Sequence, residues 1–493
     1  MAGRSRVVVV GAGVGWLACA ARLAATGWDV AVLEQAPVVG GKLGIREVDG
    51  FRFDTGPSLV TLPWTVRDVL GDTGAVDALD LRRLDPIARY RFADGTWLDA
   101  HADDDRFAAE LDAVIGVGAA VQWAALMARA AHVWGASADP VLRSPLRGVR
   151  DLLPLAADPR DLAAVAPHRT VRSLGREYLS DPRLRVLLDR YATYSGSDPR
   201  RAPAALVTVP YAERRWGGWY VTGGLRRIAD VLADRVRAHG GHIATSTPVS
   251  SITVRGGRAT GVVTADGREW PADAVVANAD AAVVADVLLP RAVGRPLRRR
   301  LRVAPRSLAG WVLLLGVRTD RLSGRAAAMP GHTVLFGGDY DAEFDALFGR
   351  HPAYATDPTI YVAVPDDPSV APPGHQSWFV LVNAPRTDQV ASPPAGYADR
   401  VLELMAARGI DVRPGVVLAE ERPPSVLARE AAAPGGAIYG SSSNGPLAAF
   451  LRPPNAGPVE DLHLVGGSSH PGGGLPLVLL SAEIVARAVV SAR

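Results

Sequence analysis

The stretch RVVVVGAGVGWLACAARLAATGWDVAVLE, residues 6–34, decides the fold of this 493-residue chain. Its four valines predict a buried strand, and an alanine-rich helix follows as far as about Thr26. Between them, a tight turn contains Gly11, Gly13 and Gly15, and a second strand ends at Glu34. This order is the dinucleotide-binding βαβ unit. Its backbone N–H groups and helix N-terminus bind a pyrophosphate, and its carboxylate binds ribose hydroxyls.

Position 16 departs from the G-x-G-x-x-G fingerprint of this unit. The fingerprint requires a third small residue there, because the helix packs closely on the strand, and this chain has Trp16. Two consequences are open: the helix stands away from the strand, or the indole occupies the space of a dinucleotide. Gly15 would relieve part of the crowding. Since all other parts of the unit are present, the stretch still predicts a dinucleotide site.

Length and composition predict a globular protein of two or three compact lobes, since 48% of the residues are hydrophobic. We recognise no secretory leader and no run of 18 apolar residues, so we expect a cytoplasmic protein without a membrane span. The single cysteine, Cys19, falls in the first helix, where a buried apolar role is expected, and disulfide or cysteine–metal frameworks are excluded. A net charge of +3 does not imply a nucleic-acid partner.

Cationic side chains are concentrated in RAVGRPLRRRLRVAPR, which begins at Arg291 and ends at Arg306. Such a segment can contact anionic lipid head groups, at roughly 1 kcal/mol per cation near the surface. This interpretation predicts a peripheral position at the inner face of the membrane. A solvated helix face is the alternative, and the sequence leaves both open.

Glycines recur directly after the first unit. Gly40 and Gly41 predict a second close backbone approach beside the first turn, and Lys42, the only lysine in the chain, would place a cation next to a pyrophosphate. A short strand is expected at residues 51–54. The turn that follows it, Gly56, Pro57 and Ser58, can bring backbone against a ring system.

Four motifs between residues 11 and 63 resemble the opening of the phytoene desaturase family, the carotenoid desaturases that use FAD: GAGVG, VLEQ, VGGKLG and FDTGPSLVTLP. The segment LHLVGGSSHPGGGLPLVLLSAEIVA, residues 462–486, resembles the closing signature of that family. Two distant glycine turns at helix starts indicate one extended cofactor held at both ends, which fits FAD better than NAD. The resemblance places the second turn at the flavin, with Gly466, Gly467, Gly473, Gly474 and Leu475.

The middle of the chain, residues 219–280, resembles the part in which this family returns to the cofactor domain. Periodicity predicts a helix to about His239, a hairpin with Gly256 and Gly257 at its tip, and a strand at residues 274–276. The resemblance implies that the backbone of Val249 lies by the adenine and that Asn278 lies near the dinucleotide.

Together these segments predict an α/β fold: a Rossmann-like, glutathione-reductase-like FAD-binding domain with a discontinuous, mixed α+β substrate domain. We assign residues 1–85, 219–290 and 455–493 to the first, and residues 86–218 and 291–454 to the second. The helical patterns of residues 107–192 can form a core or line a lipid passage. Apolar runs at residues 310–317 and 377–385 suit a sheet that walls a pocket.

The resemblance implies that the flavin accepts a hydride from a substrate C–H, while the protein positions an apolar chain and excludes water. No acid–base constellation is recognisable, although five polar residues fall near the predicted cleft: Asp54, Tyr194, Asp198, Arg200 and Glu213. His470 lies within SSHPGGG and is the catalytic candidate. The alternative for His470 is a turn histidine bonded to backbone.

The predicted function is therefore FAD-dependent desaturation of a long apolar polyene or isoprenoid. Two alternatives stay open. One is a redox-neutral isomerase or cyclase of the same fold, and the other is a flavin-free protein that binds an apolar ligand because Trp16 blocks the site. Zinc-hydrolase, P-loop and nucleophile-elbow motifs are missing, so those classes, and a metal site, are not expected. The sequence predicts no oligomeric state.

Overall fold

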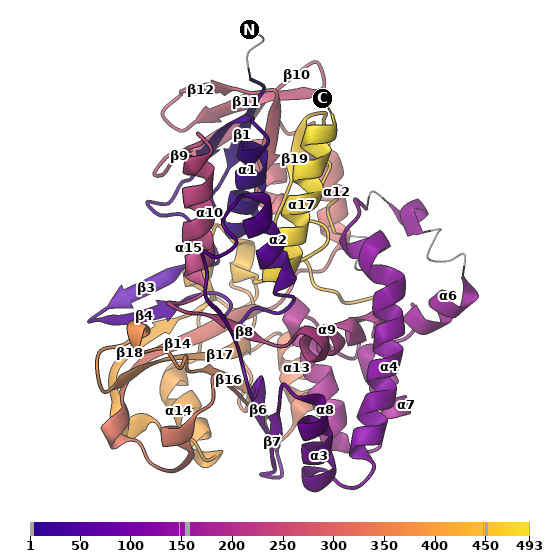
Figure 1. Cartoon of the computed structure of the whole chain (residues 1–493), viewed down its shortest axis with the longest axis vertical. Coiled ribbons are helices and arrows are strands. Elements are labelled where there is room, and N and C mark those ends of the chain that lie inside the picture. The colour runs from indigo at the N-terminus through magenta and orange to yellow at the C-terminus, as the bar shows by residue number, and fades with distance from the viewer. Residues whose placement is uncertain (1–3, 147, 153–157, 447, 449–451, 493) are drawn as a thin grey trace.

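A computed structural model describes residues 4–146, 148–152, 158–446, 448 and 452–492. The molecule has two halves (Figure 1). The upper half in the view is built on a parallel sheet and contains both described chain ends. The lower half combines a larger sheet with a group of helices.

Among the described residues, the strands form two large sheets, one small sheet and two pairs. The five-stranded parallel sheet has the order β19 (Leu462–Leu464), β13 (Ala274–Ala277), β1 (Arg6–Val10), β2 (Asp29–Leu33) and β9 (His242–Ala244). The mainly antiparallel seven-stranded sheet has the order β18 (Val416–Arg422), β14 (Ala309–Arg318), β17 (His375–Ala384), β16 (Ile360–Ala363), β15 (His332–Leu335), β6 (Ala88–Arg91) and β7 (Trp97–Ala100). The others are β10 (Val249–Arg255), β11 (Arg258–Thr264) and β12 (Glu269–Pro271), and the pairs β3 (Ile45–Val48) with β4 (Phe51–Asp54) and β5 (Leu81–Arg83) with β8 (Trp219–Val221).

Helices α1 (Val14–Ala25), α10 (Arg226–Ala238) and α17 (Leu475–Ser491) belong to the upper half, as does α2 (Trp64–Asp72). The remaining α-helices are α3 (Asp104–Val114), α4 (Ala119–Ser137), α6 (Pro159–Val165), α7 (Val171–Tyr178), α8 (Pro182–Arg190), α9 (Thr208–Trp216), α11 (Ala281–Val283), α12 (Arg295–Val303), α13 (Tyr340–Phe348), α14 (Tyr397–Ala407) and α15 (Pro424–Glu430). None of the described helices is long and apolar enough to cross a bilayer.

The valine run of β1 explains how the upper half is layered. Val7 and Val9 point into the cluster formed with α1, α10 and α17, whereas Val8 and Val10 point to the opposite face, against β10 and β11. Side chains alternate along a strand, so a strand buried on both faces needs an uninterrupted apolar run. The predicted strand–turn–helix–strand unit is confirmed.

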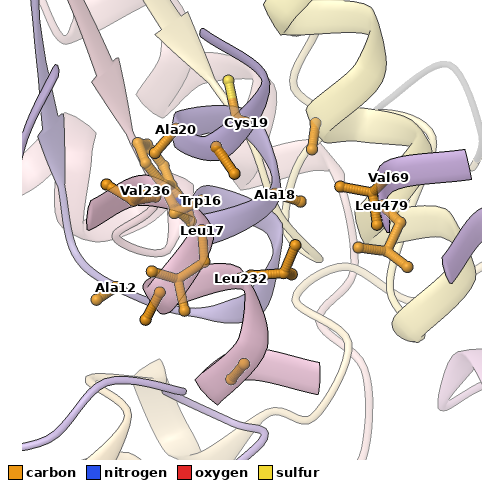
Figure 2. Close-up of a cluster of buried hydrophobic side chains, with 14 of the residues drawn as sticks. Ala12, Trp16, Leu17, Ala18, Cys19, Ala20, Val69, Leu232, Val236 and Leu479 are labelled. Carbon is orange, nitrogen blue, oxygen red and sulfur yellow. The ribbon is translucent and has the colours of Figure 1, made fainter. Parts of the chain in front are cut away.

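Of the two expected consequences of Trp16, the second is wrong, because the indole does not enter the space of a dinucleotide. Its indole is fully buried in the core between α1 and α10, on the side of α1 that faces Leu232 and Val236 (Figure 2). The close approach of α1 occurs one residue earlier, at Gly15, where an added Cβ would lie 2.5 Å from Cγ1 of Val478 in α17. The bulk of Trp16 therefore fills the core, while Gly15 provides the tight helix contact. Cys19 is buried in the same core, as expected.

The lower half has two cores. Helices α3, α4, α7 and α8 share one core with β6, to which Phe107, Leu188 and Tyr90 belong. Helix α14 packs on β14 and β17 through Val401 and Met405. The long helical pattern after residue 104 is interrupted at Gly116 and Gly118, both of which have positive φ, so two helices form.

The hairpin β3–β4 falls within the predicted cofactor segment 1–85 but contributes Phe51 and Phe53 to a cluster with Leu314 and Phe379 of the seven-stranded sheet. The predicted domain boundaries stay a prediction.

Candidate cofactor and substrate site

The central strands of the parallel sheet end at one edge. Strands β1, β13 and β19 run parallel and adjacent, so Val10, Ala277 and Leu464 lie side by side at their carboxyl ends. Gly11 and Gly466, which turn the chain soon after β1 and β19, have φ values of +97° and +113°. Ligands of open α/β sheets bind at this edge. The structure therefore brings the first and last glycine turns together, as predicted.

Asn278, directly after β13, occupies the space between these two turns. A Cβ on Gly13 would lie 2.5 Å from Nδ2 of Asn278, and a Cβ on Gly466 would clash with its Oδ1. Any side chain at either glycine would displace this amide. The absence of side chains is thus a requirement of the arrangement.

Two helices start at the glycine turns without a side-chain cap. Helix α1 follows Gly13 and α17 follows Gly474, and neither helix has an acidic residue in its first turn. The first N–H groups of a helix lack partners within the helix and attract anions. Bare backbone at Gly13 and Gly466 and two uncapped helix starts fit a dinucleotide, whose pyrophosphate would be held there.

Glu34 closes the other side of the first turn. Its carboxylate accepts hydrogen bonds from the backbone N–H groups of Ala12 (2.5 Å) and Ala36 (2.8 Å). The N–H of Thr247 donates to the carbonyl oxygen of Glu34 at 2.8 Å, which brings the chain leading into Val249 and β10 alongside. This position agrees with the expectation for Glu34 and Val249 at the adenosine end, and both roles stay predictions.

The second glycine pair contacts the first turn. The N–H of Gly40 donates to the carbonyl of Ala12 at 2.7 Å, and a Cβ on Gly41 would lie 3.1 Å from Cα of Gly13. Lys42 donates from Nζ to the carbonyls of Ala437 (2.9 Å) and Ile438 (2.7 Å).

Burial lowers the pKa of Lys42, and the charge of Asp280 opposes that shift. Its ammonium thus ties the glycine region to residues 437–438. Contact of this ammonium with a pyrophosphate stays a prediction.

The turn at Gly56, Pro57 and Ser58 abuts this region, because a Cβ on Gly56 would clash with the carbonyl of Lys42. The hydroxyl of Ser58 shares a 2.5 Å hydrogen bond with the hydroxyl of Tyr361, which also lies 2.5 Å from Nδ1 of His332. Burial lowers the pKa of His332 to about 3, and the charge of Arg190 adds to this. The imidazole is therefore neutral at pH 7.

Backbone from residues 439–441 lies over the last glycine turn. A Cβ on Gly473 would lie 2.8 Å from Cβ of Tyr439. Arg452 donates to the carbonyls of Ser441 (2.6 Å), Gly467 (3.0 Å) and Tyr439 (3.2 Å), and burial lowers its pKa to about 10. Arg452 cannot be recognised as a site residue from the sequence, since a lone arginine in a loop carries no local signal.

His470 lies in the same turn but faces the helical half. Its Nε2 is 3.0 Å from the carbonyl oxygen of Ser144, and burial lowers its pKa to about 4, so it is neutral and donates from Nε2. This contact is typical of a turn histidine bonded to backbone. The catalytic assignment stays a prediction.

Three of the other polar candidates serve local structure. Asp54 accepts from the N–H groups of Leu225 (2.7 Å) and Arg226 (3.1 Å) at the start of α10, and burial raises its pKa to about 6. Asp198 and Arg200 pair with each other at 3.0 Å. The remaining two, Tyr194 and Glu213, belong to a buried cluster described below.

Comparison with known proteins identifies the family. Residues 17–490 match the family described as flavin containing amine oxidoreductase. The chain belongs to this family. Members of known sequence include a 4,4'-diapolycopene oxygenase from Methylomonas sp, 33% identical over 99% of this chain and 98% of its own length. A zeta-carotene-forming phytoene desaturase from Myxococcus xanthus is 33% identical over 97% of this chain and 93% of its own length.

The fold agrees with that membership. A solved oxidoreductase from Methanosarcina mazei superposes with a TM-score of 0.67 at 19% identity, covering 98% of this chain and 100% of its own. The predicted fold class and the resemblance to phytoene desaturases are confirmed. The chain is an FAD-dependent oxidoreductase, so the flavin-free alternative does not hold.

Proposed function

We propose that this flavoprotein desaturates a long, largely apolar polyene. The observation that carries the proposal is the meeting of the two glycine turns, at a sheet edge that faces an apolar α+β half. A small cleft of about 20 Å³ beside Ser58 is lined by Phe53, Ala363 and Phe379 together with polar side chains that include Arg52 and Asp54. Since that volume holds about one water molecule, the support for an apolar substrate comes from relatives such as the phytoene desaturase of Myxococcus xanthus.

Bound FAD supplies the two-electron acceptor for the hydride that leaves a substrate carbon. The chain would contribute position and environment. Gly13 and Gly466 would let backbone approach the pyrophosphate, and the Gly56 turn would support the ring system. The neutral imidazole of His332 and the hydroxyl of Tyr361 form a buried hydrogen-bonded pair beside that turn, linked to it through Ser58.

The test is anaerobic mixing of the FAD-loaded protein with a hydrocarbon polyene and, separately, with the same polyene hydroxylated at one end. Desaturation predicts bleaching of the flavin absorbance and a product that is lighter by two hydrogens. A product of unchanged mass without bleaching would support the redox-neutral isomerase or cyclase instead. A product that gains oxygen only when the same mixture is exposed to air would support the chemistry named for the Methylomonas relative.

We also propose that α12 contacts an anionic membrane surface. A groove of about 590 Å³ is lined mainly by arginines of this segment: Arg291, Arg295, Arg298, Arg299 and Arg302. Two apolar side chains near these arginines in the sequence are exposed, Val287 at 63% and Val303 at 61%. Cations together with exposed apolar side chains match the charge and polarity of an anionic lipid surface.

Vesicle sedimentation tests the membrane proposal. The protein should sediment with vesicles containing phosphatidylglycerol and stay in solution with phosphatidylcholine alone. Replacing Arg295, Arg299 and Arg302 by Glu should abolish the difference. The matched control replaces three arginines elsewhere whose side chains are solvent-accessible, Arg237, Arg318 and Arg413, by Glu. Equal loss of binding in both triple variants would show that net charge, rather than this surface, is responsible.

A further inference from the structure

The helical side of the lower half contains a buried cation with an unusual set of partners. Arg190, the last residue of α8, is 6% exposed, and in the described part of the chain no carboxylate lies within 4.0 Å of its guanidinium. It donates to the hydroxyls of Tyr90 (3.1 Å) and Tyr194 (2.8 Å). Its Cζ lies 5.2, 5.3 and 4.9 Å from the ring centroids of Tyr90, Tyr191 and Tyr194.

A buried carboxylate completes the cluster without touching the cation. Glu213 of α9 is 2% exposed and accepts from the hydroxyls of Tyr191 (2.6 Å) and Tyr194 (3.3 Å). Tyr194 is only partly buried and bridges the two charges, since its hydroxyl accepts from Arg190 and donates to Glu213. The cluster thus presents a hydroxyl held between a buried positive and a buried negative group.

The cluster lies next to the turns assigned to the flavin. Tyr191 and Tyr194 belong to a 3₁₀ turn that ends at Gly196, where an added Cβ would lie 3.2 Å from Cδ2 of Tyr439. Tyr439 in turn lies against Gly473. On the other side, the charge of Arg190 acts on His332 and Tyr361, the pair joined to Ser58. The cluster around Arg190 therefore lies near the Gly56–Ser58 turn and near the last glycine turn, which contains Gly473.

A hydrocarbon ligand could not make hydrogen bonds with the buried arginine, tyrosines and glutamate of this cluster. Burying an ion costs several kcal/mol even after relaxation, so an apolar wall would be the cheaper lining for a polyene. A site that holds buried hydrogen-bonding groups instead favours a ligand that carries a matching oxygen and rejects one that lacks it. The Tyr194 hydroxyl donates its proton to Glu213 and accepts from Arg190, so its second lone pair is left to accept a hydrogen bond from a ligand hydroxyl.

We propose that Arg190, Tyr194 and Glu213 bind a hydroxyl group at one end of the substrate, which donates to the Tyr194 oxygen, so that the preferred substrate class is a hydroxylated polyene. The inference rests on the proposed function and adds to it the chemistry of the substrate end. Tyr194 is the contact residue, and Arg190 and Glu213 fix and polarise it.

The test compares a hydrocarbon polyene with the same polyene hydroxylated at one end. The FAD-loaded wild type should favour the hydroxylated compound in kcat/KM by about 100-fold, mainly through KM. Tyr194→Phe should reduce this ratio by roughly 10- to 100-fold. The control is Tyr397→Phe, which removes a buried hydroxyl bonded to the carbonyl of Ala355 in a different core and should leave the ratio unchanged.

Dissociation constants from quenching of tryptophan fluorescence keep the two proposals separable. Turnover of both compounds with equal kcat/KM would retain desaturation and overturn the oxygen site. No turnover of either compound, with tighter binding of the hydroxylated one that is lost in Tyr194→Phe, would overturn desaturation and retain the oxygen site. Equal losses for both compounds in Tyr194→Phe would assign the cluster to folding and overturn the inference.

Discussion

Two neighbouring parts of the molecule are built in opposite ways. The glycine cradle consists of Gly13 and Gly466 around Asn278, and the tyrosine cluster consists of Tyr90, Arg190, Tyr191, Tyr194 and Glu213. The cradle depends on missing side chains: Gly13 and Gly466 leave room for Asn278 and would let backbone N–H groups face a ligand. The cluster depends on bulky side chains from four separate elements, with Arg190 and Glu213 connected only through tyrosines. The first site would recognise a constant cofactor by backbone, and the second would recognise a variable substrate by side chains.

This difference explains which parts the sequence could predict. The cradle is encoded in short motifs whose spacing is visible in the sequence, so the sequence predicts the turns at residues 11–15 and 466–474. Helix α1 shows both kinds of position: the glycine at its start, Gly13, lies at the cofactor turn, whereas Trp16 lies in the core.

Replacing Trp16 by Gly should give the largest loss of stability among these variants. A small loss would contradict the view that Trp16 serves the core while the glycines before it serve the cofactor site. A glycine there restores the fingerprint but removes a fully buried indole from between α1 and α10. Loss of a buried tryptophan costs about 3 to 5 kcal/mol, and glycine inside a helix adds about 1 kcal/mol. We expect unfolding by urea at much lower concentration and reduced retention of flavin.

Two further variants separate the causes. Val121→Gly places glycine at an exposed site of α4 and should cost only about 1 kcal/mol. Trp16→Phe keeps a ring in the core and removes an indole N–H that has no hydrogen-bond partner among the described residues. It should cost far less than Trp16→Gly. Higher flavin affinity in Trp16→Gly would show that the indole obstructs the cofactor after all.

The tyrosine cluster was recognised only in part, for a physical reason. Tyr194 and Glu213 were noted as polar residues near a cleft, but Tyr90, Arg190 and His332 were not, because each stands alone within an ordinary helix or strand pattern. Their meeting depends on how β6, β15, α8 and α9 pack, which is a property of tertiary structure. Arg452 and Tyr361 were missed for the same reason.

Gly13→Ala tests the cradle directly. The new methyl group would lie 2.5 Å from Nδ2 of Asn278, and it would hold a pyrophosphate away from the backbone. We expect FAD affinity to fall about 10- to 100-fold, equivalent to about 1.4 to 2.7 kcal/mol, with little change in stability. Reconstitution of the apoprotein with FAD measures this affinity.

Gly135→Ala is the matched control for that substitution. Gly135 lies in α4 with no atom near the position of a new Cβ. Alanine there should stabilise the helix by about 0.5 to 1 kcal/mol and leave the affinity for FAD unchanged. Equal FAD affinity in Gly13→Ala and wild type would mean that the cradle does not depend on bare backbone.

Asp54 joins the hairpin β3–β4 to helix α10 of the cofactor half, and its predicted effect is visible through its pH dependence. It extends from the hairpin that packs on the seven-stranded sheet and accepts from the first N–H groups of α10 in the cofactor half. Burial raises its pKa from 3.8 to about 6. Between these values the folded state keeps the proton that the unfolded state has released, so its contribution to stability falls as pH rises from about 4 to 6.

Asp54→Asn removes this titration and keeps one oxygen as acceptor. The variant should be weakest relative to wild type at pH 4, where the neutral acid is undisturbed, and should recover about 1 to 3 kcal/mol relative to wild type by pH 7. Urea unfolding of both proteins at pH 4, 5, 6 and 7 measures the difference, and other titrating groups cancel because both proteins contain them. A difference in stability that stays constant with pH would show that burial does not raise the pKa of Asp54. The contact between the hairpin β3–β4 and helix α10 would then be solvated.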